Sequence, residues 1–304
     1  MTDPKQISTP AATLPQVASA AVVGAGTMGL GIAMASARGG VPTFLVDTSE
    51  DRLTQAKAKA TAFFDRSLAK GKLTPEARDA AVTNILTTTR LDDLAGTDLV
   101  IEAIFEDMEA KAALIGELDR VCGPETILAS NTSPLSITRI GAHSTRPERV
   151  VGLHFCLPAQ LMKLVEVTRG LRTDDAVFDR AWAYCTAIGQ KPVETKDTPG
   201  FILNHFAIPL HNRAIRMVES GVATPADIDR AIKTAYGHAM GPLEWLDLVG
   251  LDTQQRLCRT FHEITNDPEL VCPNLVHVMV AAGWLGKKTG SGFYDYADTK
   301  TFGA

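Results

Sequence analysis

The chain has 304 residues, of which 45% are hydrophobic and 21% charged, and its formal net charge is −5. This composition is typical of a globular protein with one large or two medium domains, each able to bury a core. The net negative charge argues against a nucleic-acid-binding surface, so a polyanionic small ligand would need a local basic patch.

The cysteines form no C-x-x-C pair and no Cys/His cluster. They are scattered along the chain at Cys122, Cys156, Cys185, Cys258 and Cys272. An odd, unpatterned set indicates reduced structural thiols in a cytoplasmic protein rather than disulfides or zinc ligands. We therefore expect no metal site.

A stretch without charged residues, 16–37, approaches the length of a membrane span. Four glycines interrupt it, and the preceding region carries Lys5 beside Asp3 rather than a basic cluster. Both features argue against a signal peptide or a membrane helix, so we predict no membrane segment. The proline-containing residues 1–17 are expected to form a disordered tail.

Strand and helix patterns alternate over the first two-thirds of the chain. Strands are expected at 18–23, 43–46, 99–103, 126–129, 150–155, 164–168 and 192–195, and helices at 24–38, 50–70, 108–121 and 174–188. The alternation predicts an α/β domain over residues 18–197, with a mostly parallel sheet covered by helices on both faces.

The pattern changes after Asp197, and no convincing strand follows Lys196. Thr198-Pro199 and Thr224-Pro225 each place a cap residue before a proline, which is typical of helix starts. We therefore predict an all-α C-terminal domain over residues 198–304.

A G-x-G-x-x-G motif begins at Gly24, directly after the first apolar strand, and opens a helical pattern. An acidic residue, Asp47, ends the next strand at the spacing of a dinucleotide-binding fingerprint. Gly24 is expected to allow the tight turn, Gly26 to let the pyrophosphate approach, and Gly29 to let the helix pack on the strand. The free amides at the helix start would then attract the phosphates.

The carboxylate of Asp47 can accept hydrogen bonds from ribose hydroxyls and would repel a 2′-phosphate, which favours NAD over NADP. FAD binding, and a glycine-rich turn that binds nothing, stay open on this motif alone. The expected cofactor contacts of the fingerprint are Gly24, Gly26, Thr27, Met28, Gly29 and Asp47.

A set of short motifs stands in one order along the chain. They read GAGTMGLGIA (24–33), VIEAIFE (100–106), ASNTS (129–133), GLHF (152–155), MKLVEV (162–167), PGFILN (199–204), DID (227–229), MGPL (240–243), GLD (250–252) and GSGFY (290–294). From Ala18 to Tyr296 the chain closely resembles the short-chain L-3-hydroxyacyl-CoA dehydrogenases, including bacterial 3-hydroxybutyryl-CoA dehydrogenases.

The resemblance implies a Rossmann-type NAD-binding domain and a helical C-terminal domain that takes part in substrate binding and forms a homodimer. It implies NAD as cofactor, a CoA thioester as substrate, and reversible oxidation of the 3-hydroxyl to a 3-keto group. By motif position, the catalytic residues fall on Ser133, His154, Glu166 and Asn204.

These residue types suit the oxidation of a secondary alcohol. Histidine changes protonation near neutral pH and can take the hydroxyl proton, so His154 is the expected base. Glu166 can orient the imidazole and stabilise its cation, while Ser133 and Asn204 can donate hydrogen bonds to substrate oxygens. From spacing alone, each residue could instead be structural: a core histidine, an ion-pair partner, a turn serine or a capping asparagine.

Other family-based expectations concern the rim of the site. Glu106 and Asn131 are expected beside the cofactor. Lys57 and Lys59, on the helix predicted over 50–70, either contact the phosphates of CoA or belong to an ordinary solvated basic face.

The chain departs from the family after the expected base. It reads His154-Phe155-Cys156-Leu157-Pro158, where family members commonly read H-F-F-N-P. Leu157 therefore replaces a hydrogen-bonding asparagine. This keeps two alternatives open: a related dehydrogenase of a free hydroxy acid such as carnitine or a sugar acid, and a non-catalytic NAD-binding protein.

Overall fold

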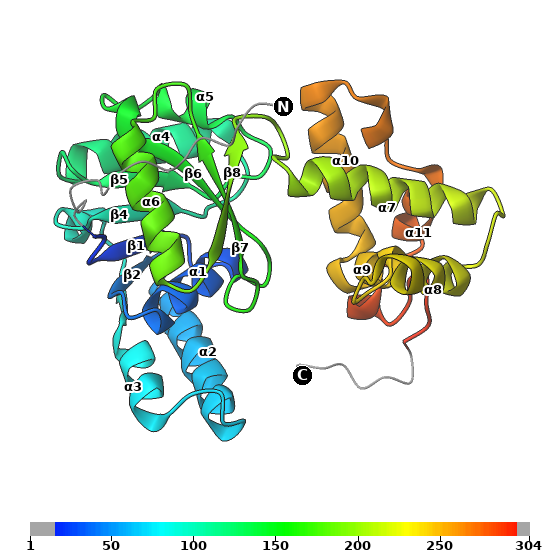
Figure 1. The fold of residues 1–304 in the computed structure, drawn as a ribbon, viewed down its shortest axis with the longest axis horizontal. Coiled ribbons are helices and arrows are strands. Elements are labelled where there is room, and N and C mark those ends of the chain that lie inside the picture. Colours follow the sequence, from blue (N-terminus) through cyan, green and yellow to red (C-terminus); the bar gives the residue numbers. More distant parts are fainter. Residues whose placement is uncertain (1–15, 297–304) are drawn as a thin grey trace, which may run out of the picture. The chain divides into compact units, whose positions relative to one another are not determined.

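The structure is a computed structural model that describes residues 16–296 and divides into two compact units, Met1–Thr198 and Pro199–Ala304 (Figure 1). Of the disordered tail predicted over residues 1–17, the part up to residue 15 lies outside the described residues. In the part of the chain that is described, no helix combines the length and the apolar character that crossing a membrane requires.

The first unit is built on one sheet, which contains eight strands within residues 16–296, in the order β3-β2-β1-β4-β5-β6-β7-β8. All neighbours are parallel except β6 and β7, which are antiparallel. The order of the first six is that of a Rossmann-type sheet, so the predicted α/β class is confirmed. The strands are β1 (Ala20–Val23), β2 (Thr43–Val46), β3 (Ile85–Thr88), β4 (Leu99–Glu102), β5 (Ile127–Ser130), β6 (Val150–Phe155), β7 (Leu164–Arg169) and β8 (Lys191–Lys196).

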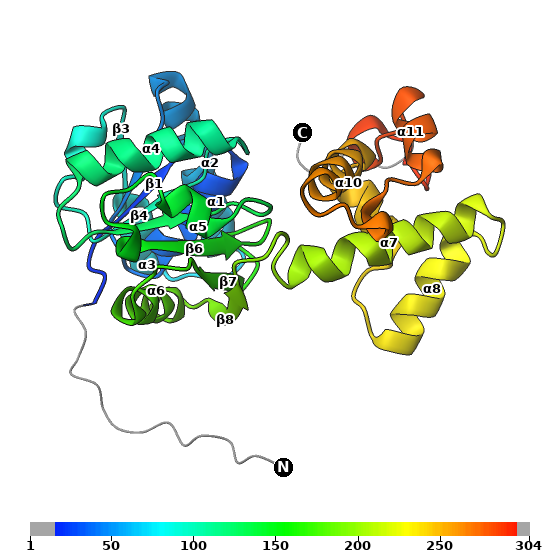
Figure 2. The ribbon, with the colours of Figure 1, turned by 90° about the horizontal axis from the view of Figure 1, so that it is seen from above.

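Alternate residues of the strands enter different cores on the two faces of the sheet. In β1, Ala20 and Val22 pack with one cluster, and Ala21 and Val23 pack with another, as the two-residue period of a strand requires. Figure 2 shows α4 and α6 on opposite faces. One face is covered by α1 (Thr27–Arg38), α2 (Glu50–Ala69), α3 (Pro75–Thr83) and α6 (Asp175–Ala187), and the other by α4 (Met108–Val121) and α5 (Ile137–Gly141).

The structure adds α3, β3 and α5 to the elements that the patterns predict. Strand β3 has four residues at the edge of the sheet, and two of them, Leu86 and Thr87, are exposed, so its apolar signal is weak. Helix α3 does carry a start signal, because the Thr74 hydroxyl accepts a hydrogen bond from the backbone of Ala77 and Pro75 follows it. The same signal identified the helix after Thr224.

The second unit is helical. Its helices are α7 (Leu203–Glu219), α8 (Pro225–Tyr236), α9 (Pro242–Val249), α10 (Leu251–Thr265) and α11 (Asn274–Ala281), and the short 3-10 turns of the two units are η1 (Leu91–Leu94), η2 (Pro147–Arg149), η3 (Pro268–Leu270) and η4 (Lys287–Thr289). The predicted start at Thr224 is confirmed, since its hydroxyl accepts from the Asp227 amide at 3.2 Å. The predicted start at Thr198-Pro199 is wrong. Gly200 (φ 83°) and Phe201 (φ 49°) adopt left-handed conformations that end any helix there.

Two buried aspartates explain the DID and GSGFY motifs of this unit. Asp229 accepts hydrogen bonds from two backbone amides at the start of α9 and from the hydroxyl of Tyr294. Asp247 accepts from the backbone amides of Phe293 and Tyr294. The motifs therefore tie the segment after η4 to the helices.

The imidazole of His211 makes the second unit sensitive to acid. This residue of α7 is buried, its ring stacks on Trp245 with centroids 4.3 Å apart, and its Nδ1 has no hydrogen-bond partner among the described residues. Burial lowers the pKa of His211 from 6.5 to about 4. Between these values His211 therefore binds more proton in the unfolded chain than in the folded chain, and its contribution to stability falls as the pH drops through that window.

We predict that His211 removes about 2 kcal/mol from the free energy of unfolding between pH 7.5 and pH 5. The His211→Phe variant keeps a ring against Trp245 and should lose this part of the pH dependence. Urea denaturation of both proteins at several pH values measures the difference. Equal pH slopes for the two proteins would contradict the assignment.

Candidate functional site

The predicted site residues of the first unit gather where the parallel strands end. The loops after β1, β4, β5 and β6 leave the same edge of the sheet, and the strand order reverses at β1, between β2 and β4. Open α/β sheets bind their ligands at such a switch point. The topology therefore makes this edge the candidate site.

The glycine turn after β1 shows why each glycine is needed. A Cβ added to Gly24, whose φ is 109°, would lie 2.7 Å from the carbonyl oxygen of Ala103, and one added to Gly29 would lie 1.8 Å from the carbonyl oxygen of Gly24. A Cβ on Gly26 would meet nothing within 4 Å. The packing of the chain does not demand glycine at position 26, but the close approach of a pyrophosphate would. The turn therefore fits a dinucleotide.

Asp47 lies beside this turn and is held by the backbone. Its carboxylate accepts hydrogen bonds from the amide of Ala25 at 3.0 Å and from that of Ser49 at 3.1 Å. The guanidinium of Arg52 lies 3.8 Å from the same carboxylate. Each carboxylate oxygen can accept more than one hydrogen bond, so a ribose diol can still bind.

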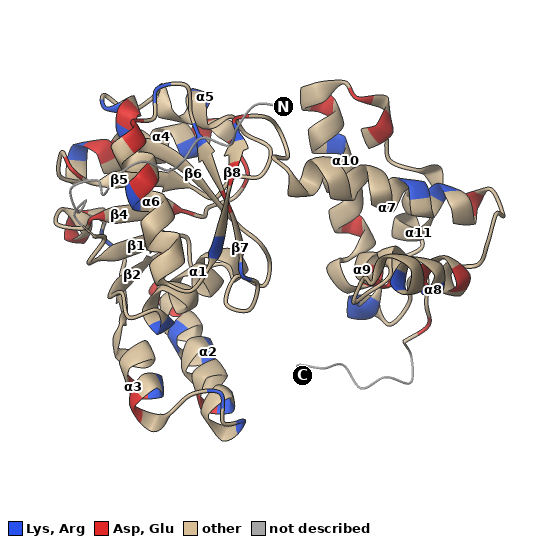
Figure 3. Cartoon of the chain, in the orientation of Figure 1, with Lys and Arg blue, Asp and Glu red and all other residues tan. Residues whose placement is uncertain are grey.

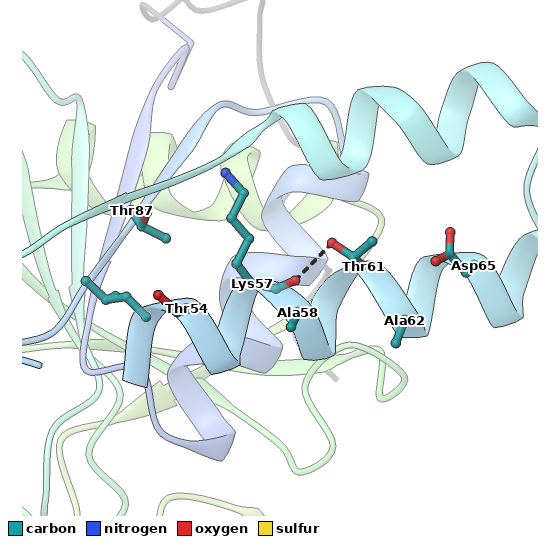
Figure 4. Close-up of a pocket in the computed structure, with 8 residues that line it drawn as sticks. Thr54, Lys57, Ala58, Thr61, Ala62, Asp65 and Thr87 are labelled. Carbon is teal, nitrogen blue, oxygen red and sulfur yellow. Dashed lines mark hydrogen bonds between the residues drawn. The ribbon is translucent and has the colours of Figure 1, made fainter. Parts of the chain in front are cut away.

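A hollow of about 430 Å³ runs along α1 and α2 beside the glycine turn, and Gly26, Thr27 and Lys59 line it. Met28, the other predicted contact of the turn, packs partly against the core. Lys57 lines a different hollow of about 530 Å³, together with Thr87 and six other residues of α2 (Figure 4).

The two candidate lysines of α2 therefore face different ways, as residues two positions apart on a helix do. Figure 3 shows the Lys and Arg residues that α2 carries. They do not form one basic face, because Lys57 and Lys59 line separate hollows.

The structure brings Ser133, His154 and Glu166 together. The antiparallel pairing of β6 and β7 places His154 directly opposite Glu166, and the imidazole Nδ1 lies 2.7 Å from the carboxylate Oε2. The other ring nitrogen, Nε2, lies 2.8 Å from the hydroxyl oxygen of Ser133. His154 and Glu166 are both buried.

This chain of contacts defines what the imidazole can do. An ionised carboxylate only accepts hydrogen bonds, so Nδ1 of His154 carries the proton that Glu166 accepts. The lone pair on Nε2 then faces the hydroxyl of Ser133 and can accept a proton. The thiol of Cys156 does not compete as a nucleophile, because burial raises its pKa to about 12.

Asn131 and Glu106 lie on the neighbouring loops. The side-chain oxygen of Asn131 accepts a hydrogen bond from the amide of Phe155 at 2.9 Å, which fixes the end of β6 next to His154. The carboxyl of Glu106 accepts from the hydroxyl of Thr132, and its partial burial raises its pKa.

A buried ion pair beneath these loops escaped the sequence analysis. The ammonium of Lys111, on α4, lies 2.9 Å from the carboxylate of Glu102, and the hydroxyl of Ser130 donates to the same carboxylate. The sequence did contain a sign of this ion pair, because Glu102 ends an otherwise apolar strand and a buried carboxylate needs a partner. Lys111 also lies 3.8 Å from Glu106, so it links the core to the rim of the site.

Asn204 belongs to the second unit. It is the second residue of α7, half-buried, and its backbone amide donates to the carbonyl of Gly200 at 3.0 Å. Its predicted contact with the substrate stays a prediction. Leu157, the departure from the family pattern, is exposed over 56% of its surface, three residues after the histidine.

We predict that Lys111→Met destabilises the chain by about 3–5 kcal/mol, because it leaves the carboxylate of Glu102 buried without its cation. The double variant with Glu102→Gln should regain much of this loss. Urea denaturation of the two single variants and the double variant gives the coupling between the residues. Strictly additive losses would show that the pair is not coupled.

Two family models, one after the other along the chain, together match nearly all of the residues that the structure describes. The NAD-binding domain of 3-hydroxyacyl-CoA dehydrogenases matches residues 19–198, and the C-terminal domain of the same enzymes matches residues 200–296.

Relatives named for a dehydrogenase activity are similar over almost the whole chain. A 3-hydroxybutyryl-CoA dehydrogenase of Bradyrhizobium diazoefficiens is 43% identical over 92% of this chain and 95% of its own length. The mitochondrial hydroxyacyl-coenzyme A dehydrogenase of Rattus norvegicus is 42% identical, with 90% of each protein covered. Among solved structures, FadB2 of M. tuberculosis is 41% identical with a TM-score of 0.89, covering 93% of this chain and 100% of that one.

Proposed function

The chain belongs to the 3-hydroxyacyl-CoA dehydrogenase family, and on that premise we propose that it oxidises an L-3-hydroxyacyl-CoA reversibly to the 3-ketoacyl-CoA with NAD, through His154 as base. The observation that carries the residue assignment is the chain of contacts from Ser133 through His154 to Glu166. This arrangement presents a proton acceptor, Nε2, and stabilises the cation that results.

In the proposed reaction, Nε2 of His154 takes the proton of the substrate 3-hydroxyl. NAD, when bound, would supply the acceptor for the hydride of C3. Glu166 keeps Nδ1 protonated, orients the ring and stabilises the imidazolium. The hydroxyl of Ser133 lies within hydrogen-bond reach of Nε2 and donates to the substrate oxygen as negative charge develops there. Asn204 supplies a second donor to the substrate in this scheme.

The cofactor is proposed to lie over the glycine turn. The backbone at Gly26, Thr27 and Met28 would receive the pyrophosphate at the start of α1, where free amides and the helix dipole favour anions. Asp47 would accept hydrogen bonds from the adenosine ribose. Glu106 and Asn131 stand on the loops that would flank the nicotinamide.

Both candidate lysines for the CoA phosphates stay open, and Lys59 lines the hollow that contains Gly26 and Thr27, where the pyrophosphate of NAD is proposed to bind. Lys57 lines the separate hollow with Thr87.

We further propose a cytoplasmic homodimer that associates through the second unit. All five cysteines are free, as a reducing compartment would keep them. The second unit exposes large apolar side chains, including Phe206 (72%), Val278 (56%) and Trp284 (52%), that a partner subunit could cover. Light scattering of the purified protein measures the assembly.

Leu157 stands where family members commonly have a hydrogen-bonding asparagine. A free hydroxy acid therefore stays the second candidate substrate. A panel of acetoacetyl-CoA with NADH, and of carnitine and L-gulonate with NAD, separates the two by nicotinamide absorbance. We expect turnover of the CoA ester and none of the free acids. Tight NADH binding without turnover of any substrate would instead indicate a non-catalytic NAD-binding protein.

We predict that His154→Gln folds and binds NADH but loses kcat by a factor of about 10²–10⁴, because the glutamine amide cannot accept the proton that the imidazole takes. Steady-state kinetics with acetoacetyl-CoA measures kcat, and NADH fluorescence measures binding. The matched control is His143→Gln, since His143 is exposed in the loop after α5. A kcat near that of the wild type in His154→Gln would remove this residue from the mechanism.

A further inference from the structure

Asp197 ties the end of the first unit to the loop that carries Ser133. It follows β8, one residue before this unit ends. Its carboxylate accepts three hydrogen bonds of 2.8 Å, from the hydroxyl of Ser136 and from the backbone amides of Ile137 and Thr138. Hydrogen bonds to an ionised acceptor are stronger than those between neutral groups, so this contact holds the loop firmly.

The loop itself is stiff. The hydroxyl oxygen of Thr132 accepts a hydrogen bond from the amide of Leu135 at 3.1 Å, which closes a turn around Ser133 and Pro134. The ring of Pro134 fixes one backbone dihedral of that turn, and the residue is buried. Because the turn ends directly before Ser136, a displacement of Ser136 is transmitted to Ser133.

We propose that Asp197 is a positioning residue for the reaction: it holds the loop where the hydroxyl of Ser133 reaches Nε2 of His154, 2.8 Å away. The inference rests on the proposed function, in which Ser133 donates a hydrogen bond to the substrate oxygen. It goes further because it assigns a role in the reaction to a residue of the segment between β8 and α7.

Capping of α5 does not by itself explain these contacts. The helix has only five residues, and the hydroxyl of Ser136 already accepts from the amide of Arg139 at 3.2 Å, as an N-cap residue does. The carboxylate of Asp197 adds acceptors for the next free amides from a segment outside the helix. It therefore fixes the start of α5, and the loop before it, to the end of β8.

Two carboxylates from distant parts of the chain anchor the loop, one on each side of Ser133 in sequence. Glu106 accepts from the hydroxyl of Thr132, and Asp197 accepts from the hydroxyl of Ser136. Glu106 is also expected beside the cofactor, so its removal would mix two effects. Asp197 has no expected contact with the cofactor or the substrate, which makes it the informative position.

The test uses Asp197→Asn in the full-length protein, which keeps the size of the side chain but replaces one acceptor oxygen by a donor. We expect kcat for the reduction of acetoacetyl-CoA by NADH to fall about 10- to 100-fold, because a misplaced donor stabilises the transition state less. The KM of acetoacetyl-CoA and the dissociation constant of NADH should stay within about twofold, since ground-state binding does not use this donor.

The matched control is Asp98→Asn. Asp98 likewise accepts from two backbone amides and a hydroxyl, those of Ala18 and Ser19, but it precedes β4 and so lies at the edge of the sheet opposite the candidate site. This variant loses contacts of the same kind and should keep kcat within about twofold of the wild type.

The background of Ser133→Ala distinguishes a positioning role from a general loss of structure. Adding Asp197→Asn to Ser133→Ala should lower kcat by no more than about threefold further, because the group through which Asp197 acts is already gone. A fall by the same factor in both backgrounds would overturn the inference. Ser136→Ala, which removes the hydroxyl that donates to Asp197, serves as a second variant if Asp197→Asn does not fold.

The ¹⁵N signal of Nε2 in His154 gives a readout that does not depend on turnover. In Asp197→Asn it should move in the direction in which Ser133→Ala moves it, because both changes weaken the contact of the hydroxyl with Nε2. An unmoved signal in the folded variant would overturn the inference and leave the proposed function intact. Failure of the wild-type protein to reduce acetoacetyl-CoA would instead overturn the proposed function, so the two failures are distinguishable.

Discussion

The antiparallel pairing of β6 with β7 is the constraint on which the proposed chemistry depends. It is the one reversal of direction in the sheet of residues 16–296, and it sets His154 directly opposite Glu166. Side chains paired in this way lie on the same face, within reach of each other. Leu153, Phe155 and Val165 point to the other face, where they are buried in the core. A shift of one residue in this register would exchange the two faces, so the hydrophobic core itself holds the imidazole against the carboxylate.

Buried carboxylates recur around the site, and each has a partner from a different element. Glu166 is paired with His154, and Glu102 with Lys111 and Ser130. Burying a charge is unfavourable unless hydrogen bonds and an opposite charge compensate it. Asp47 follows the same rule at the rim, where backbone amides hold it. The positions of these polar groups are therefore determined by the surrounding chain before any ligand binds.

Much of the fold could be predicted, because strand and helix periods alternate and the glycine motif has its full context. The expected class, the parallel sheet and the dinucleotide turn follow from local patterns. Other features depend on tertiary contacts that no local pattern carries. Phe201 adopts a positive φ that a non-glycine residue rarely takes, and this moves the start of α7. The separation of Lys57 from Lys59 depends on the hollows that neighbouring elements form, and the partner of Glu102 comes from a helix across the face of the sheet.

The central claim is that His154 presents an unprotonated Nε2 to the substrate because Glu166 holds the proton on Nδ1. Long-range proton–nitrogen correlation of the protein labelled with ¹⁵N-histidine reports the tautomer directly, and the His154→Gln spectrum assigns the signal. The account predicts a neutral ring protonated at Nδ1, with Nε2 showing the shift of an acceptor nitrogen. A ring protonated at Nε2 and bare at Nδ1 would contradict it, because such a ring could not take a proton from a substrate hydroxyl.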